Sequence, residues 1–509
     1  MITRREFVKA GLATAACAFA YAGLPMFAAS DRKLNVLFIA VDDLRPELGC
    51  YGVKDMHTPN MDALAASGTL FNRAYCQQAV CSPTRTSLLT GRRPDTTRVY
   101  DLQTHFRKTI PDVVTLPEYF KAHGYHTQGL SKIYHGGLDD PQSWSVPHWV
   151  PKLNTYASPE TRAMLAKEAQ DLKTQGEDVT AKVLERDPKT GLALKVTRPT
   201  RRVNGPPWEA ADVPDNTFAD GATADHAIEV LREIKDKPFF LAVGFLKPHL
   251  PFVAPKKYYD MYPLDKIKLA DNPYPPKDAP DYALARWGEL RNYKGMPKKG
   301  DMPDKEAREL RRGYYAAATY TDAQIGRVIN ELDRLGLREN TVIVLWGDHG
   351  WQLGEHSEWC KHTNFEVATH VPLIISAPGQ KKGIKTEAFA EFVDIYPTLC
   401  DLCGLPLPKG LEGTSLKPVI ADPKRPWKSA AFSQYPRGGG IMGHSMRTDR
   451  YRYTEWAEPG KEPAAREVYD HKTDPEENVN IANLPANKAL VEELSRKLHN
   501  GWQGALPAK

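Results

Sequence analysis

The first candidate for chemistry is a cysteine that opens a predicted helix. Residues 81–91 read Cys-Ser-Pro-Thr-Arg-Thr-Ser-Leu-Leu-Thr-Gly, so Cys81 stands two residues before a proline and enters a short apolar run. A helix N-terminus presents free backbone N–H groups and the positive end of the helix dipole, which favour a bound anion and lower the pKa of a thiol. A buried structural thiol is the alternative interpretation, because cysteine is often only a small core residue.

Carboxylates gather at the ends of two predicted buried strands. The apolar run 34–41 ends in Asp42 and Asp43, and a second apolar run is followed by Asp348 and His349. The carboxyl ends of parallel strands lie at the edge where open α/β sheets bind ligands. Adjacent carboxylates repel each other, so burying them together requires a cation. The pattern predicts a metal site, with a solvent-exposed turn as the alternative for the first pair.

Basic side chains follow other predicted strand ends. Lys132 and His135 come after one strand, and His249 follows the strand at 238–245. Prolines on both sides restrict the backbone around His249, which suits a side chain that must hold one orientation. Lys361 follows Asp348 and His349 a short distance along the chain. These residue types bind the oxygens of anions, although each of them alone is more often structural or solvated.

The elements that position these residues alternate between apolar strands and helical patterns, which predicts a large, mainly parallel sheet flanked by helices. Predicted helices cover 112–123, 223–234, 313–335 and 393–405, and a last strand covers 370–377.

Two stretches interrupt this alternation. Residues 150–215, with a short helix at 159–172, and residues 253–312 lack clear periodicity, so we interpret both as excursions that shape a pocket. Beyond residue 435 the pattern predicts a small antiparallel sheet and a terminal helix at 488–502. The expected divisions are an export signal at 1–30, a catalytic domain at 31–435 and a C-terminal subdomain at 436–509.

Composition excludes several classes of protein. Lys and Arg exceed Asp and Glu by only 5 in 509 residues, and no basic stripe is interleaved with aromatic residues, which argues against nucleic-acid binding.

Arg4 and Arg5 precede a weakly hydrophobic, Ala-rich stretch that resembles a twin-arginine export signal, so we expect a periplasmic or secreted protein without a permanent membrane anchor. Cys400 and Cys403 form a C-x-x-C without a second pair, which indicates core thiols or one disulfide and not a zinc site.

Together these motifs resemble the type I, formylglycine-dependent sulfatases of the alkaline-phosphatase-like superfamily, and most closely the iduronate-2-sulfatases. The Cys-x-Pro-x-Arg motif followed by Thr-Gly is their signature, and the resemblance extends over most of the mature chain. The matching pieces are residues 40–46, 81–91, 247–249, 347–351, 353–356, 358–359, 361, 369–374, 433–437, 447–448 and 451–454.

The resemblance implies a mechanism that begins with modification of Cys81. A formylglycine-generating or sulfatase-maturing enzyme oxidises the cysteine to an aldehyde, and one hydroxyl of the hydrated aldehyde attacks sulfur and expels the alcohol. Loss of a proton from the other hydroxyl then releases sulfate, a step that an unmodified cysteine cannot perform.

The family's roles carry over to matching positions in this chain. One divalent cation is implied to be held by Asp42, Asp43, modified Cys81, Asp348 and His349. The resemblance assigns calcium, but magnesium stays open because an imidazole is a less typical calcium ligand.

The remaining catalytic roles fall on basic residues. Arg85 and Lys132 are implied to stabilise the formylglycine and the sulfate charge, and His135 to assist breakdown of the sulfated diol. His249 and Lys361 are implied to grip sulfate and relieve charge on the leaving alkoxide.

Specificity is expected to depend on the excursions and on a pocket lined by Trp351, His356, Glu358, Lys247, Tyr100 and Asp101. The hypothesis is a hydrolase that removes O-sulfate from terminal sugars of a sulfated glycosaminoglycan or algal polysaccharide. The alternatives are hydrolysis of small aryl or choline sulfates, hydrolysis of phosphate or phosphonate monoesters, and a non-catalytic glycan-binding protein whose Cys81 is never converted.

Overall fold

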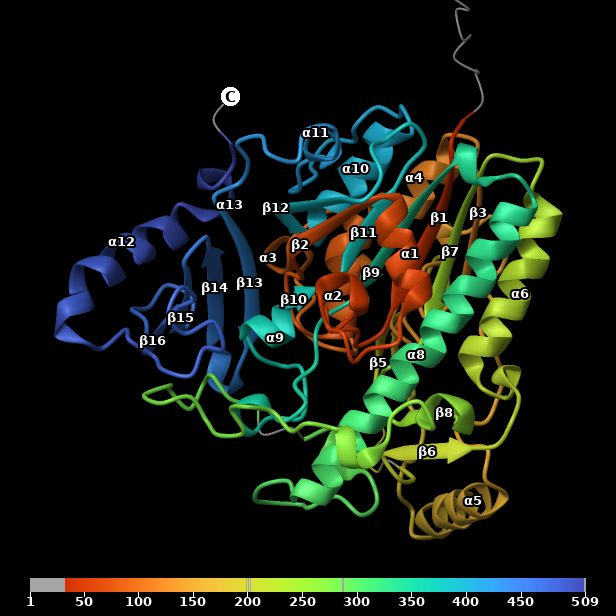
Figure 1. Ribbon diagram of the computed structural model, residues 1–509, viewed down its shortest axis with the longest axis horizontal. Helices are drawn as coiled ribbons and strands as arrows, with labels where there is room; N and C mark the ends of the chain where they lie inside the picture. The colour runs from red at the N-terminus through yellow and green to blue at the C-terminus, as the bar shows by residue number, and fades with distance from the viewer. Residues whose placement is uncertain (1–32, 198, 200, 202, 286–287, 508–509) are drawn as a thin grey trace, which may run out of the picture. The chain divides into compact units, whose positions relative to one another are not determined.

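An eight-stranded sheet carries the candidate residues. The computed structural model describes residues 33–197, 199, 201, 203–285 and 288–507, so the predicted export signal lies outside the described residues. The strand order is β10-β2-β11-β9-β1-β7-β3, with β12 paired to β2 (Figure 1). The strands are β1 (Asn35–Val41), β2 (Thr69–Tyr75), β3 (His126–Ser131), β7 (Phe239–Phe245), β9 (Thr341–Gly347), β10 (His370–Val371), β11 (Leu373–Ser376) and β12 (Ile384–Glu391).

The sheet is mixed and mainly parallel, as predicted. Strands β3, β7, β1 and β9 pair in parallel, whereas β10 and β11 run antiparallel to their neighbours. The single strand predicted at 370–377 is therefore wrong in detail, because Pro372 separates two short strands. Proline has no N–H to donate to a ladder, which explains the break.

Both faces of the sheet are covered by helices, and every residue of β1, β7 and β9 is buried. Leu37 and Ile39 face one core with helices α1, α6 and α8, and Val36 and Phe38 face the other with α2, α4, α10 and α11 (Figure 1). The bounds are α1 (Pro59–Ser67), α6 (Ala219–Ile234) and α8 (Asp304–Arg334) on the first face, and α2 (Cys81–Thr90), α4 (Leu116–Ala122), α10 (Ile395–Leu402) and α11 (Lys417–Ala421) on the second. Because both faces of these strands are buried, their sequences are continuous apolar runs.

The excursions contain more regular structure than predicted. The first holds the predicted helix, α5 (Pro159–Thr174), and the second ends in the first nine residues of α8, where charged residues conceal the helical pattern. Strands β6 and β8 pair in parallel and join the two excursions. The remaining elements are β4 (Val183–Arg186), β5 (Ala193–Val196), β6 (Trp208–Ala211), β8 (Phe252–Pro255), α3 (Pro94–Thr97), α7 (Lys256–Tyr259) and α9 (Glu366–Thr369).

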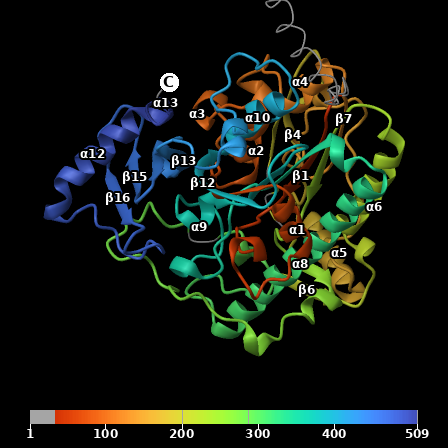
Figure 2. The same cartoon turned by 45° about the horizontal axis from the view of Figure 1, so that its top comes forward.

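The C-terminal region is a four-stranded antiparallel sheet with α12 packed on it (Figure 2). Its elements are β13 (Ala430–Pro436), β14 (Met442–Thr448), β15 (Tyr451–Ala457), β16 (Ala465–Asp470), α12 (Lys488–His499) and α13 (Gly501–Gly504). The boundary expected at 435 falls inside β13, so this sheet begins earlier than the sequence pattern indicated.

Two further sequence expectations concern thiols and membranes. Cys400 and Cys403 are free thiols at the end of α10, and Cys400 is fully buried, which agrees with core thiols and not with a disulfide. Among the described residues, no helix combines the length and apolar character needed to cross a bilayer.

A buried ion-pair network joins the large sheet to the C-terminal region. The Lys428 Nζ atom lies 2.9 Å from Glu391 Oε2 and 2.6 Å from Asp394 Oδ1, and Arg93 forms two further bonds of 2.8 Å to Glu391. Burial alone would raise the pKa of Glu391, but Arg93 and Lys428 lower it to about 2. Glu391 therefore depends on its cations to remain ionised in the interior, whereas burial raises the pKa of Asp394 despite the charge of Lys428.

Replacing Lys428 with methionine is expected to lower the free energy of unfolding by about 3–5 kcal/mol, because it leaves buried carboxylate charge uncompensated. Denaturant unfolding measures this change. Lys417→Met is the matched control, since the partly exposed ion pair between Lys417 and Asp401 contributes about 1 kcal/mol or less. Equal losses in the two variants contradict the prediction.

Candidate active site

Parallel strand ends bring the acidic residues together. Val41 at the end of β1 is paired with Gly347 of β9 on one side and with Phe245 of β7 on the other. The Asp348 N–H donates to the Val41 carbonyl at 3.1 Å, which holds the turn after β9 against the end of β1. Asp42 and Asp348 therefore lie side by side, as the sequence predicts.

Helix α2 places Cys81 beside these carboxylates. Cys81 is the first residue of the helix, and Thr84 fixes its first turn by donating to the Asp348 carbonyl at 3.0 Å. The Cys81 Sγ atom lies 3.3 Å from both Asp42 Oδ1 and His349 Nε2. The thiol thus faces the acidic cluster directly.

Four side chains offer ligand atoms that all lie within 4.8 Å of one another: Asp42, Cys81, Asp348 and His349. Asp43 joins them from a left-handed backbone conformation, with φ 61°, and its Oδ1 lies 3.4 Å from His349 Nε2. Every member of this group is buried. Three carboxylates and an imidazole in such proximity form a donor set for a cation.

The protonation of His349 supports this fit. Its Nδ1 lies 3.0 Å from the Gly350 carbonyl, which can only accept, so Nδ1 carries the proton of the neutral ring. Burial lowers the pKa of His349 to about 4, despite the opposing influence of Asp43. The Nε2 lone pair therefore points at carboxylate oxygens of Asp43 and Asp348, an arrangement that a cation between them would stabilise.

The carboxylates differ in their electrostatic surroundings. Burial raises the pKa of Asp348 to about 7, and the neighbouring Asp42 adds to this effect. Burial also opposes ionisation of Asp42, but Lys132 and Arg85 bring the pKa of Asp42 well below its usual range. The Asp42 Oδ2 atom accepts no hydrogen bond from the described residues, and the Lys132 ammonium lies 3.3 Å from it.

Arg85 connects the acidic cluster to the strand end of β3. Its Nε donates to Asp348 Oδ2 at 2.9 Å and its second terminal nitrogen to Asp42 Oδ1 at 3.1 Å. Its remaining terminal nitrogen donates to the carbonyls of Lys132 and Ile133. These contacts hold both carboxylates in one orientation toward Cys81.

The thiol pKa differs in direction from the sequence expectation. A helix N-terminus predicts a lowered value, yet burial and the negative charge of Asp42 raise the pKa of Cys81 well above the ordinary value for cysteine. The expectation was wrong because desolvation and a neighbouring carboxylate outweigh the helix dipole. An unmodified Cys81 is therefore a neutral thiol and a poor nucleophile.

Lys361 and His249 face the cluster from the other side. Lys361 Nζ lies 3.0 Å from Asp43 Oδ1 and 5.0 Å from the centre of the Trp351 ring. His249 Nε2 lies 4.0 Å from Asp43 Oδ2, and Nδ1 is held at 2.6 Å from the Leu250 carbonyl. The structure thus brings both basic residues to the acidic cluster.

His135 is near this group but makes fewer contacts. Burial lowers the pKa of His135 well below its usual range, and the charge of Lys132 lowers it further. Its Nδ1 has no hydrogen-bond partner among the described residues. His135 is therefore neutral and lies beside a small cavity that Arg85 also lines.

Trp351 lies beneath Lys361, but the structure gives the other five predicted pocket residues different partners. Lys247 donates to the carbonyls of His249 and Pro251, both at 2.7 Å, and so supports the histidine loop. His356 Nε2 lies 2.8 Å from the Glu476 carbonyl.

Of the other three, Tyr100 and Asp101 are bound within their own loop, whereas Glu358 contacts the second excursion. Glu358 accepts from the Ala285 N–H, Tyr100 donates to Asp95, and Asp101 caps a turn. These hydrogen bonds orient the five side chains, and His356 Nδ1 has no hydrogen-bond partner among the described residues, so all five stay predicted substrate contacts.

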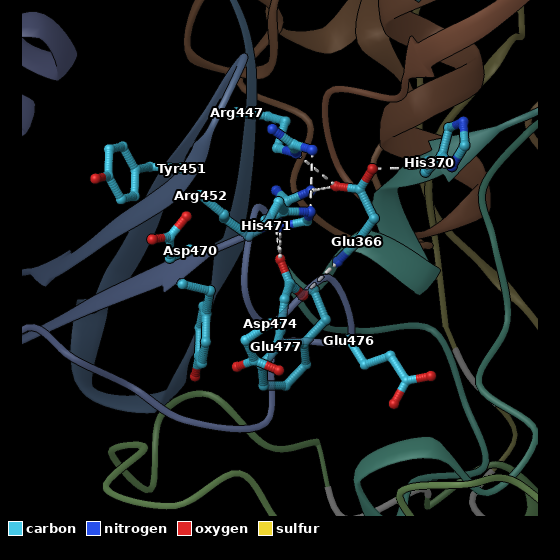
Figure 3. Close-up of polar contacts among 12 residues, drawn as sticks. Glu366, His370, Arg447, Tyr451, Arg452, Asp470, His471, Asp474, Glu476 and Glu477 are labelled. Carbon is cyan, nitrogen blue, oxygen red and sulfur yellow. Dashed lines mark hydrogen bonds and ion pairs between the residues drawn. The ribbon is translucent and has the colours of Figure 1, made fainter.

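A group of possible metal ligands away from Cys81 contains Glu366, His471 and Glu477 (Figure 3). Arg452 bridges the two glutamates, and Arg447 lies 3.1 Å from Glu366 Oε2 and 3.0 Å from His471 Nδ1. His471 Nε2 is 2.9 Å from Glu477 Oε1. Two arginines neutralise the two carboxylates and both ring nitrogens are in use, so this network stabilises the junction with β14 and β15 and does not suit a metal.

Sequence reasoning missed Glu289. Its Oε2 lies 3.2 Å from Lys361 Nζ and its Oε1 lies 3.4 Å from His249 Nε2. Burial opposes its ionisation, but Lys361 and His249 hold the pKa of Glu289 well below its usual range. A single glutamate in a stretch without periodicity carries no signal that could have identified it.

Comparison with known proteins gives consistent matches. The sulfatase family model matches residues 34–405, and the model for the C-terminal part of N-sulphoglucosamine sulphohydrolase matches residues 354–503. Iduronate 2-sulfatase from Mus musculus is 35% identical over 545 residues, covering 91% of this chain and 93% of the relative.

Solved structures show the same fold. Phosphonate monoester hydrolase from Silicibacter pomeroyi has a TM-score of 0.70 at 26% identity, covering 93% of this chain and 96% of that one. BT4656, solved in complex with its substrate D-glucosamine-2-N,6-O-disulfate, has a TM-score of 0.70 at 24% identity, covering 93% and 98% of the two chains.

Proposed function

The chain belongs to the sulfatase family, and from this premise we propose that it removes O-sulfate from a sulfated carbohydrate. The fold is the alkaline-phosphatase-like fold of this family, and the activity is that of a sulfuric ester hydrolase. Members of the family use a formylglycine made from cysteine and a divalent metal. The supporting observation here is the group of Asp42, Asp43, Asp348 and His349 around Cys81, faced by two basic residues.

We assign the roles within the site as follows. Formylglycine at position 81 would supply a hydroxyl nucleophile. Asp42, Asp43, Asp348, His349 and modified Cys81 would hold a divalent cation, which we take to be Ca²⁺ with Mg²⁺ as the alternative, and the bound cation would polarise a sulfate oxygen. The oxygen-rich composition of these ligands favours a hard cation such as calcium.

The basic residues complete the proposed mechanism. Arg85 and Lys132 fix the carboxylates and offset the sulfate charge, and Lys361 donates hydrogen bonds to sulfate oxygens. His249 presents Nε2, since Nδ1 is committed to the Leu250 carbonyl, and gives a proton to the leaving oxygen. Neutral His135 takes a proton when the sulfated residue breaks down. The water that restores the nucleophile enters after the alcohol has left.

The proposed substrate is a terminal, sulfated uronic-acid-containing sugar of a glycosaminoglycan or algal polysaccharide. Iduronate 2-sulfatase from mouse matches over nearly the whole chain, which supports this class over small sulfate esters. We further propose export by the twin-arginine route, maturation by a formylglycine-generating enzyme, and a catalytic part followed by a C-terminal subdomain that begins near β13.

A substrate panel tests the proposal. The enzyme, produced with a maturing enzyme, is assayed on a disaccharide with a terminal 2-O-sulfated uronate, on aryl and choline sulfates, and on phosphonate monoesters. We expect kcat/KM for the disaccharide to exceed the values for all small esters by about 100-fold or more, because binding energy from the sugar is used in the transition state. A higher value for a phosphonate or an aryl sulfate contradicts the proposed substrate class.

A further inference from the structure

Glu289 is an ionised carboxylate that the second excursion brings to the two basic residues facing Cys81. Its two oxygens are divided between Lys361 Nζ, at 3.2 Å, and His249 Nε2, at 3.4 Å. The side chain is 14% exposed, so these two basic residues are its principal surroundings. A largely enclosed carboxylate in an anion-binding site opposes the binding of anions, which calls for a functional explanation.

The position of Glu289 relative to Cys81 indicates what it contacts. Asp43 meets Lys361 and His249 from the side of the acidic cluster, whereas Glu289 meets the same two side chains without belonging to the cluster of ligand atoms around Cys81. Lys361 and His249 are the residues proposed to bind sulfate oxygens and to protonate the leaving oxygen. A side chain that contacts both of them is therefore within reach of the alcohol portion of the substrate.

The chemistry of this position follows from the charge. A carboxylate only accepts hydrogen bonds, so it binds a hydroxyl group next to the ester oxygen and repels a second anionic group there. Adjacent oxygens of a sugar ring lie about as close together as hydrogen-bonded atoms, so a residue that contacts His249 and Lys361 can reach the neighbouring position.

We propose that Glu289 is a specificity-determining residue that accepts a hydrogen bond from a free hydroxyl beside the sulfate ester and rejects substrates with a second sulfate at that position. This inference rests on the proposed sulfatase function and adds a selection rule to it. The enzyme acts on sugars whose neighbouring sulfate is absent or has already been removed, so another sulfatase must act first on vicinally disulfated sugars.

The test compares two substrates and four proteins. The substrates are a terminal 2-O-sulfated uronate disaccharide with a free neighbouring hydroxyl and the same disaccharide sulfated at that hydroxyl. Wild-type enzyme is expected to favour the first by about 10- to 100-fold in kcat/KM, the range of one charge-assisted hydrogen bond. In Glu289→Gln the amide oxygen still accepts but the charge is gone, so this preference falls by about tenfold or more.

Glu289→Ala separates the effect of losing the hydrogen-bond acceptor from the effect of losing the negative charge. It loses the acceptor as well as the charge, so its kcat/KM on the monosulfated substrate falls by about tenfold or more, mainly through KM. Asp265→Asn is the matched control, because it removes a carboxylate charge from the same excursion at a site where the side chain is 73% exposed. This control keeps the wild-type preference.

The outcomes separate this inference from the proposed function. If the wild-type enzyme hydrolyses both disaccharides equally well, or Glu289→Gln remains active with an unchanged preference, the assignment of Glu289 is wrong while the sulfatase function stands. If mature wild-type enzyme hydrolyses no sulfate ester, the proposed function itself fails. The monosulfate and disulfate of catechol repeat the comparison without a sugar, and a preference for the monosulfate that disappears in Glu289→Gln supports the assignment.

Discussion

Cys81→Ser, produced without a maturing enzyme, is expected to accept one sulfate group per chain and then stop. The serine Oγ attacks sulfur, the bond between sulfur and the leaving oxygen breaks, and the alcohol takes the proton. The resulting sulfate ester has no second hydroxyl whose deprotonation could expel sulfate. Steady-state kcat therefore falls by about 10⁴-fold or more relative to the mature enzyme. Intact mass spectrometry measures the trapped product as the added mass of one SO₃ group.

Two controls define this result. Cys81→Ala offers no hydroxyl and gains no mass, whereas Cys403→Ala, at a free thiol on another helix, retains multiple turnover after maturation. The peptide that contains Cys81 in mature wild-type enzyme is expected to differ from cysteine by one sulfur-to-oxygen exchange and the loss of two hydrogens. Full turnover by wild-type protein whose Cys81 is an unmodified thiol contradicts the proposed mechanism, and the raised pKa of that thiol makes such activity unexpected.

The proximity of the strand-end residues could be predicted because it depends on topology alone. Asp42 and Asp348 each follow an apolar run, and such runs form the buried parallel strands β1 and β9. The ends of neighbouring parallel strands must meet at one edge, whatever the side chains are. The same reasoning places His249 after β7 and Lys132 after β3.

Electrostatic properties could not be predicted in this way. The pKa of Cys81 depends on Asp42, which lies 39 residues away in the sequence and 3.3 Å away in space. Helix position alone predicts the wrong direction, because it contains no information on burial or on neighbouring charges. The same limit applies to Asp348, whose pKa is raised by burial and, to a smaller extent, by Asp42 at the end of another strand.

The remaining differences between the predicted and the observed structure lie in the two excursions and in elements rich in polar residues. Strand β12 alternates exposed charged residues with buried ones and lies beside β2 at one side of the sheet, so no long apolar run marks it. Glu289 belongs to a stretch whose path follows from contacts with distant residues and not from periodicity. His356 and Glu358 sit within a matching motif, yet their hydrogen bonds go to the chain itself. Motif membership therefore did not establish substrate contact.

Removing the divalent cation is expected to abolish turnover of the mature enzyme. Without it, the carboxylates of Asp42, Asp43 and Asp348 and the His349 lone pair face one another, and the divalent charge that would polarise a sulfate oxygen is lost. Loss of several kcal/mol of transition-state stabilisation corresponds to about 10³-fold or more in kcat. Dialysis against a chelator followed by addition of Ca²⁺ or Mg²⁺ measures the loss and identifies the ion that restores activity.

Calorimetry and thermal unfolding provide the controls, because they report binding in the absence of turnover. Calcium at about 1,000 times its dissociation constant is expected to stabilise the protein by about 4 kcal/mol, with one ion bound per chain. Asp348→Asn is expected to lose this stabilisation. His349→Asn keeps it, since an amide oxygen replaces the imidazole and suits a hard cation. Two bound ions per chain would mean that the neutralised network of Glu366, His471 and Glu477 also binds metal. Unchanged stabilisation in Asp348→Asn would show that the cation lies elsewhere, because this variant removes a charged ligand from the centre of the proposed site.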